Sequence, residues 1–257
     1  MKQRYVIPAA LSFMVIAGCQ ATEVEQPNAP QSPSTVEGVP SDSISSQQTT
    51  YSSILFGEIG TTVAYDGMAE YGYLLTLEQI DEAEHSEVVY VYEGLMNDGL
   101  GDVDGTRNFR LTYTVTGDEV VETITNHDPH RRWEDSRLLN SIIPSKVVLK
   151  GELKTGTTWD ERFEYQGQSH TALNELTVQL TEEGKTQYRV ETIVKDIQGF
   201  VNQTYTETRV FEEGLGLVSF SNTQPLDFFD EEYQAEYSEA EFYQFGYGQS
   251  GEISDHE

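Results

Sequence analysis

The chain has 257 residues, a formal net charge of −29 and a single cysteine. With 44 acidic and only 15 basic residues, its composition excludes a nucleic-acid-binding protein that relies on a basic face. One cysteine excludes an intramolecular disulfide scaffold. The hydrophobic fraction of 37% and the aromatic fraction of 11% are sufficient for a packed core, so we expect at least one folded domain.

The N-terminus has the features of an export signal. Lys2 and Arg4 give it positive charge, and the apolar stretch 6–16 is too short to span a bilayer as a stable helix. This stretch ends in an aliphatic residue, two small residues and the cysteine, Ile16-Ala17-Gly18-Cys19. The tetrad resembles the lipobox of bacterial lipoprotein precursors.

The resemblance implies a lipid anchor outside the cytoplasm. In that class the thiol of Cys19 receives a diacylglycerol, and residues 1–18 are removed as a signal peptide. Two or more acyl chains, palmitate for example, hold a protein stably on a membrane at about 0.8 kcal/mol per buried methylene. In a Gram-positive host the anchor is expected in the outer leaflet of the cell membrane. With Gln20 rather than Asp after the cysteine, the family's sorting rule favours the outer membrane where the host has two. The alternative is an ordinary secretory signal with an unmodified cysteine.

Residues 19–50 are expected to form a disordered tether behind the lipidated cysteine. From residue 20 they contain no aromatic and no basic residue, hold four of the eight prolines, and are otherwise rich in Ser, Thr and Gln. Such a composition buries too little apolar area to offset the entropy of ordering the chain. The alternative is a loop of the folded domain.

Residues 51–225 predict an antiparallel β domain. Apolar and polar residues alternate with a period of two over many short runs. The clearest run places four apolar side chains on one face, Phe109, Leu111, Tyr113 and Val115. Gly117-Asp118 and residues 183–185 fit hairpin turns between such runs. We expect a mostly β fold in which antiparallel meanders form a sandwich, a half-barrel or a large curved sheet.

Two departures from this pattern stand out. Asp128-Pro129 fits the start of one short helix that Pro144 ends. Trp159, Phe163 and Tyr165 share one face of a predicted strand, and only Glu161 breaks the apolar pattern of that face.

A second resemblance concerns the body of the chain. The runs 149–159 and 213–218, which hold a Gly-x-x-x-x-Gly-x-x-Trp segment and a Gly-Leu-Gly-Leu turn, resemble uncharacterised secreted lipoproteins of Gram-positive bacteria. The resemblance implies an antiparallel β domain without a known activity. Similar orders of strands over about 65–125 and 146–225 are compatible with two related halves, although β-rich chains also give such similarity by chance.

Residues 226–257 are expected to form a separate acidic tail. They contain ten acidic residues, eight aromatic residues and no Lys or Arg. Phe229, Tyr233 and Tyr237 have the spacing of one helical face. Either the tail is solvated and its aromatic rings lean on the domain, or it folds on a partner, with the rings as anchors and the acids as steering charge.

Candidate chemical sites are few. Asp98, Asp102 and Asp104, among glycines, resemble an oxygen-rich calcium loop, although the spacing of a helix-loop-helix calcium site fails and an acidic hairpin loop is the alternative. The segment 127–130, His-Asp-Pro-His, lacks further ligands for zinc, and Arg131-Arg132 beside it disfavours a cation. The sequence shows no nucleophile elbow or phosphate-binding loop, so we assign no catalytic residue and no cofactor apart from the calcium candidate.

These features favour a non-enzymatic, lipid-anchored envelope protein whose β domain binds a protein, glycan or lipid. Its membrane contact would be the lipid on Cys19, and nucleic acid is not an expected partner. The alternative is an envelope hydrolase with a carboxylate or metal site. An apolar cavity would indicate a lipid carrier, a filled interior a protein or glycan partner, and acids converging in a concave pocket an enzyme.

Overall fold

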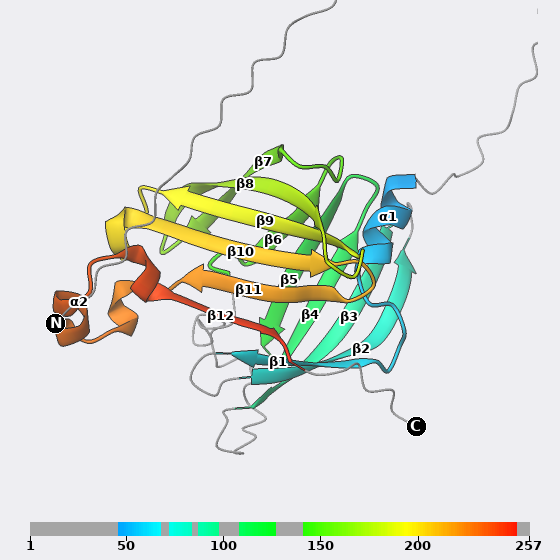
Figure 1. The fold of residues 1–257 in the computed structure, drawn as a ribbon, viewed down its shortest axis with the longest axis horizontal. Coiled ribbons are helices and arrows are strands. Elements are labelled where there is room, and N and C mark those ends of the chain that lie inside the picture. Colours follow the sequence, from blue (N-terminus) through cyan, green and yellow to red (C-terminus); the bar gives the residue numbers. More distant parts are fainter. Residues whose placement is uncertain (1–45, 68–71, 84–86, 98–107, 127–140, 251–257) are drawn as a thin grey trace, which may run out of the picture. The chain divides into compact units, whose positions relative to one another are not determined.

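The computed structural model describes residues 46–67, 72–83, 87–97, 108–126 and 141–250, all within the unit Asp42–Glu257 (Figure 1). The first half holds helix α1 (Ser46–Ile54) and strands β1 (Thr62–Gly67), β2 (Gly72–Ala83), β3 (Glu87–Asn97), β4 (Phe109–Val115), β5 (Glu119–Asn126) and β6 (Ser145–Lys150). The second half holds strands β7 (Thr157–Tyr165), β8 (Gln168–Leu180), β9 (Thr186–Lys195), β10 (Thr204–Glu212), β11 (Gly216–Thr223) and β12 (Gln244–Gln249). Short helical elements accompany these strands, namely η4 (Val201–Gln203), η5 (Leu226–Phe228), α2 (Glu231–Glu236) and η6 (Ala240–Tyr243).

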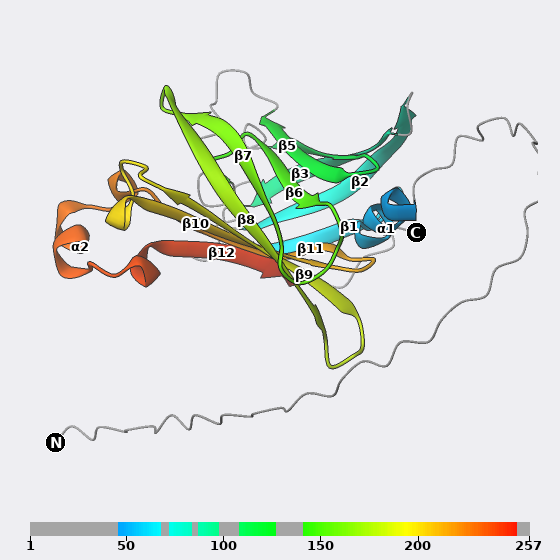
Figure 2. The same ribbon diagram turned by 90° about the horizontal axis from the view of Figure 1, so that it is seen from above.

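The described strands form one antiparallel sheet in the order β6-β5-β4-β3-β2-β1-β12-β11-β10-β9-β8-β7. Each strand pairs with its neighbour in the chain, with one exception at β6 and β7, and the first strand pairs with the last. The sheet curves strongly, so that its two ends, β6 and β7, lie near each other (Figures 1 and 2). The predicted mostly β, antiparallel fold is therefore confirmed, in the form of a large curved sheet.

Alternation of side chains explains why these segments are strands. In β4 the four apolar residues predicted to share a face are all buried, and the residues between them are exposed or half-buried. Trp159 and Phe163 are buried in the same way on β7. Gly117-Asp118 connects β4 to β5 as predicted. The turn between β7 and β8 consists of Gln166 and Gly167, both with positive φ (49° and 75°), which matches the twist of a tight two-residue hairpin.

The tail expected from residue 226 contains a strand of the sheet. β12 lies between β1 and β11, and its registers join Tyr65 to Gln249 and Phe220 to Tyr247. The physical reason is burial, because Tyr247 is only 8% exposed and stacks on Phe220 with 5.2 Å between ring centroids. The sheet thus continues past the boundary expected at residue 225.

Helix α1 crosses the boundary expected between the tether and the β domain, because it begins at Ser46 and the domain was expected from residue 51. Tyr51 is fully buried, and its hydroxyl donates hydrogen bonds to the carbonyl oxygens of Asp118 (3.0 Å) and Gly151 (2.6 Å). The helix is therefore fastened to the loops that come after β4 and β6. Within the described part of the chain, neither α-helix is long and apolar enough to cross a membrane.

Candidate functional site

The site residues predicted from the sequence fall outside the described residues. These are Cys19, the calcium candidates Asp98, Asp102 and Asp104, and the segment 127–132 with its two histidines and two arginines. Their roles stay predictions. The described residues instead contain two features that the sequence did not reveal, an ionic network inside the curve of the sheet and an open groove at the end of β1. They also contain part of the acidic aromatic segment that the sequence predicted, which lies before β12.

The centre of the ionic network is Arg209 on β10. Its side chain is only 2% exposed and makes two ion pairs. One joins its Nη1 to Oε2 of Glu122 on β5 across the inside of the sheet (2.7 Å), and the other joins its Nε to Oε1 of Glu207 on its own strand (2.7 Å). The guanidinium also lies 4.8 Å from the ring centroid of Phe220. Arg209 therefore ties together two walls that belong to different halves of the chain.

Buried hydroxyl groups complete the hydrogen bonding of both carboxylates. Tyr113 donates to Oε2 of Glu122 (2.9 Å), and Tyr205 donates to Oε2 of Glu207 (2.7 Å). The amide of Asn222 reaches the hydroxyl of Tyr205 at 3.4 Å. Charge-assisted hydrogen bonds of this kind compensate the desolvation of the buried charges.

The network shifts the pKa values of its members. Burial alone would raise the pKa of Glu207, but the positive charges of Arg209 and Lys146, with hydrogen bonds from Ser141 and Tyr205, hold it below its ordinary value. Burial alone would lower the pKa of Arg209, and its two carboxylate partners raise it well above the ordinary value instead. Both groups therefore stay charged at neutral pH, so Glu207 is not poised to act as a general acid.

A second set of buried polar side chains joins β6 to β7. The place where these two ends of the sheet meet without strand pairing is named here the seam. Nζ of Lys146 on β6 lies 2.6 Å from Oε1 of Glu161 on β7 and 2.8 Å from Oδ1 of Asn174 on β8. The other carboxylate oxygen of Glu161 accepts a hydrogen bond from the backbone N–H of Val147 (3.0 Å). Thr192 donates to the same Asn174 oxygen (2.7 Å). At this seam the carboxylate of Glu161 thus accepts the backbone hydrogen bond that a neighbouring strand would otherwise accept.

A cluster of buried tyrosines lies beside these ions. The tyrosine cluster consists of Tyr65, Tyr73, Tyr92, Tyr113 and Tyr247, whose rings make contacts with centroid distances from 4.5 to 5.8 Å. Burial is the main cause that raises the pKa of every member above its ordinary value, and neighbouring tyrosines or Glu122 add to the effect. These hydroxyls are therefore neutral hydrogen-bonding groups of the interior.

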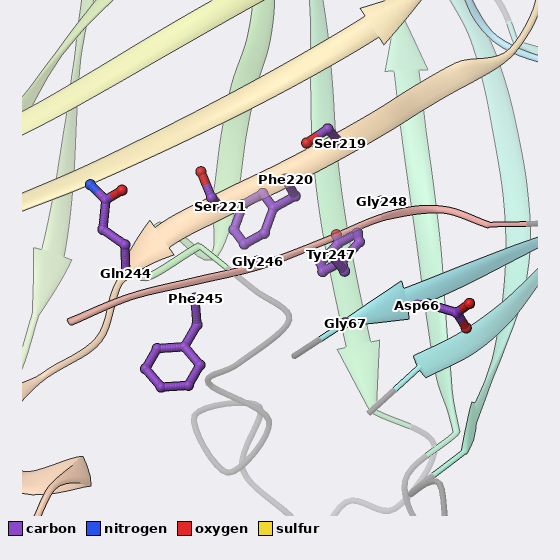
Figure 3. Close-up of a pocket in the computed structure, with 10 residues that line it drawn as sticks. All are labelled: Asp66, Gly67, Ser219, Phe220, Ser221, Gln244, Phe245, Gly246, Tyr247 and Gly248. Atoms are coloured by element: carbon purple, nitrogen blue, oxygen red, sulfur yellow. The ribbon is translucent and has the colours of Figure 1, made fainter. Parts of the chain in front are cut away.

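An open groove of about 520 Å³ lies where β12 extends past the end of β1 (Figure 3). Pairing between these strands ends at Gly67 and Tyr247, so the start of β12 has no partner on β1. The groove is lined by Asp66, by Ser219 and Ser221 of β11, and by residues 244–248. Gly246 is required by close packing, since a Cβ there would collide with the Phe220 carbonyl oxygen and with Ser221. The lining is chemically mixed and the groove is open to solvent.

The chain from 224 to 243, named here the aromatic excursion, leaves the sheet between β11 and β12. It contains η5, α2 and η6, with six aromatic residues, seven acidic residues and no Lys or Arg. Phe229 stacks on Tyr233 (4.8 Å between centroids), and Tyr233 contacts Tyr237 (4.6 Å), although of these three residues only Tyr233 lies within α2. Phe228 and Phe242 remain 43% and 39% exposed.

These arrangements limit the chemistry that the described residues can perform. Glu122 and Glu207 converge, but on a buried arginine that neutralises both. Among the described residues, no group of three His, Cys, Asp or Glu side chains is placed to hold a metal ion. An apolar ligand inside the curve would have to contact buried, paired ions. The described charged groups of the interior are therefore paired with one another.

Comparison with known proteins finds two solved structures of limited similarity. No protein-family model matches the chain, and no curated protein matches it. Two solved structures are similar, an exported-protein candidate with a YmcC-like fold from Bacteroides fragilis NCTC 9343 and a lipoprotein candidate from Parabacteroides distasonis ATCC 8503. Each has a TM-score of 0.38 and 9% identity, and each match covers 76% of this chain and 96% of the other.

Proposed function

We propose that this chain is a lipid-anchored cell-envelope protein whose β domain binds a partner through its outer surface. The observation that carries the proposal is the ionic centre of the concave side, where Arg209 is paired with Glu122 and Glu207 at 2.7 Å. A carrier of lipid needs apolar side chains facing a space, and a hydrolase needs a carboxylate that can exchange a proton with substrate. Neither requirement fits carboxylates that are buried and already neutralised.

The outer face of the sheet supports the same proposal. Leu74 on β2 and Leu95 on β3 are cross-strand partners, 43% and 45% exposed. Leu173 on β8 and Ile193 on β9 form a second such pair, 54% and 40% exposed. Apolar residues that are exposed in adjacent pairs, rather than singly, are typical of surfaces that contact another molecule.

The membrane anchor is the part of the proposal that rests on sequence alone. Metabolic labelling with a clickable fatty acid should mark the wild-type protein and should not mark Cys19→Ser. A variant that keeps the label would overturn the anchor.

Partner binding is tested by photo-crosslinking on intact cells of the native host. A photoreactive phenylalanine analogue is placed at one exposed position at a time, at Leu74, Leu173 or Phe242, in the full-length protein. We expect a discrete protein adduct from at least one position. Native mass spectrometry of the purified protein provides the counter-test, because a co-purifying lipid, together with no protein adduct at any position, would overturn the proposal in favour of a lipid carrier.

A further inference from the structure

The aromatic excursion is much longer than the connection between its two strands requires. Thr223, the last residue of β11, is the direct cross-strand partner of Gln244, the first residue of β12. Antiparallel partners of this kind can be joined by about two residues. The whole chain from 224 to 243 therefore loops out between two residues that already face each other, beyond the end of the sheet (Figures 1 and 2). The sheet gains no strand from it.

The excursion is nevertheless held in one shape by its own contacts. The hydroxyl of Tyr233 donates to the carbonyl oxygen of Phe242 (2.8 Å), and that of Tyr243 donates to the carbonyl oxygen of Tyr237 (2.6 Å). The side chain of Asp230 caps α2 by accepting a hydrogen bond from the Tyr233 N–H (2.7 Å). A surface that is ordered before binding loses little conformational entropy when a partner docks.

The surface of the excursion combines exposed rings with unpaired negative charge. Phe228 and Phe242 are the two most exposed aromatic side chains among the described residues. Four exposed glutamates make no ion pair within the described part of the chain, Glu231, Glu232, Glu239 and Glu241. Cationic side chains bind to the faces of aromatic rings, and neighbouring carboxylates strengthen that attraction and repel anionic partners. Long basic side chains also cover rings with their methylene stems.

We propose that the aromatic excursion docks an arginine- or lysine-rich segment of a partner protein. The proposal rests on the proposed function and names the surface and the chemistry of its partner. Phe228 and Phe242 contact the basic side chains directly, and the glutamates select the sign of charge and speed the encounter.

The test is a binding titration of the full-length protein in detergent with a fluorescent oligo-arginine peptide, monitored by anisotropy at increasing salt. An oligo-glutamate peptide serves as the negative control. Phe228→Ser/Phe242→Ser should weaken binding by about tenfold, the loss expected when exposed aromatic anchors are removed. A variant in which all four unpaired glutamates are replaced with glutamine should weaken peptide binding by a similar factor. The affinity of this variant should also depend less on salt concentration.

A matched variant controls for net charge. It replaces four exposed glutamates elsewhere, on β7 and β8 and in the turn before β9, namely Glu164, Glu175, Glu182 and Glu183, with glutamine. This variant should bind the peptide within about twofold of wild type, because the charges lie outside the docking surface. Thermal melting of each variant verifies that the fold is intact.

Any of three results would overturn the proposal that the aromatic excursion is a docking surface. These are no binding of oligo-arginine by the wild type below about millimolar concentration, an equal loss in the matched variant, or unchanged binding after removal of both rings. The cellular experiment separates this proposal from the broader one. Adducts from Leu74 or Leu173 but not from Phe242 would refute the docking surface and leave the proposed function intact.

Discussion

Replacing Arg209 with methionine tests the ionic network most directly. Methionine keeps much of the length and apolar volume of the arginine stem but removes its charge and all of its hydrogen-bond donors. Glu122 and Glu207, which are 4% and 0% exposed in their side chains, then remain buried without their main cation. The perturbation therefore isolates the electrostatic part of the network.

The expected loss of stability is large. Removing one partner of a buried ion pair costs about 3–5 kcal/mol, because the remaining charge stays buried without compensation. For a domain of this size, that corresponds to a fall in melting temperature of roughly 6–20 °C. The matched control is Arg189→Met, since Arg189 pairs with Glu191 on the same strand at 2.8 Å but both side chains are exposed, 42% and 52%. An exposed pair contributes only about 0–1 kcal/mol.

The stability of the wild type and that of Arg209→Met should change with pH in opposite directions. In the wild type the pKa of Glu207 is lowered, so its stabilising effect is present above the unfolded value of about 4.3 and is lost as pH falls through the folded value. Without Arg209, the effect of burial on Glu207, which raises its pKa, loses its largest opposing charge. Protonation of Glu207 then restores stability to the variant as pH falls.

The assay is urea-induced unfolding of both variants and the wild type at a series of pH values. The triple variant Arg209→Met/Glu122→Gln/Glu207→Gln should recover part of the loss, because no buried charge is left unpaired. A loss below about 1 kcal/mol for Arg209→Met, or a variant that becomes less stable on mild acidification, would refute the reasoning.

Three further predictions concern the seam, a close contact and the tyrosine cluster. Glu161→Ala should speed hydrogen exchange of the Val147 amide by roughly tenfold or more, since its acceptor is lost; exchange mass spectrometry showing no change in the β6 peptide would contradict this. Gly94→Ala should cost about 1–3 kcal/mol in a thermal melt, because the new Cβ would collide with the ring of Phe109, whereas Gly57→Ala meets only an ordinary contact and should not. The tyrosine cluster should ionise only as the protein unfolds, and its raised pKa values mean that stability is lost as pH rises above about 10; ultraviolet absorbance should show a stepwise rather than a gradual appearance of tyrosinate.

Local alternation was sufficient to predict the strands with simple patterns. The run from Phe109 to Val115 has four inward apolar residues, and the structure buries all of them. The single break in β7, Glu161, was visible as a polar residue on an apolar face, but its partner was not. Lys146 lies on another strand, and only the curvature of the sheet brings the two side chains together.

Local sequence patterns could not predict the last strand or the Arg209 network either, because both depend on partners that are far away in the chain. β12 reads Gln-Phe-Gly-Tyr-Gly-Gln, and glycine and glutamine weaken the signal of a strand. Its assignment depends on pairing with β1, far away in the chain. On β10 the inward positions hold Glu207 and Arg209, and this pair of charges at inward positions was the available signal for a buried network.

The pairing of β1 with β12 also decides when this protein can fold. The strand pairing that joins its two halves is made by the first and the last strands of the chain, so a chain growing from its N-terminus cannot complete this pairing until β12 is free. Contacts of such long sequence separation close slowly, because the loop entropy must be overcome before they form. The complete sheet therefore forms only once β12 can pair with both β1 and β11.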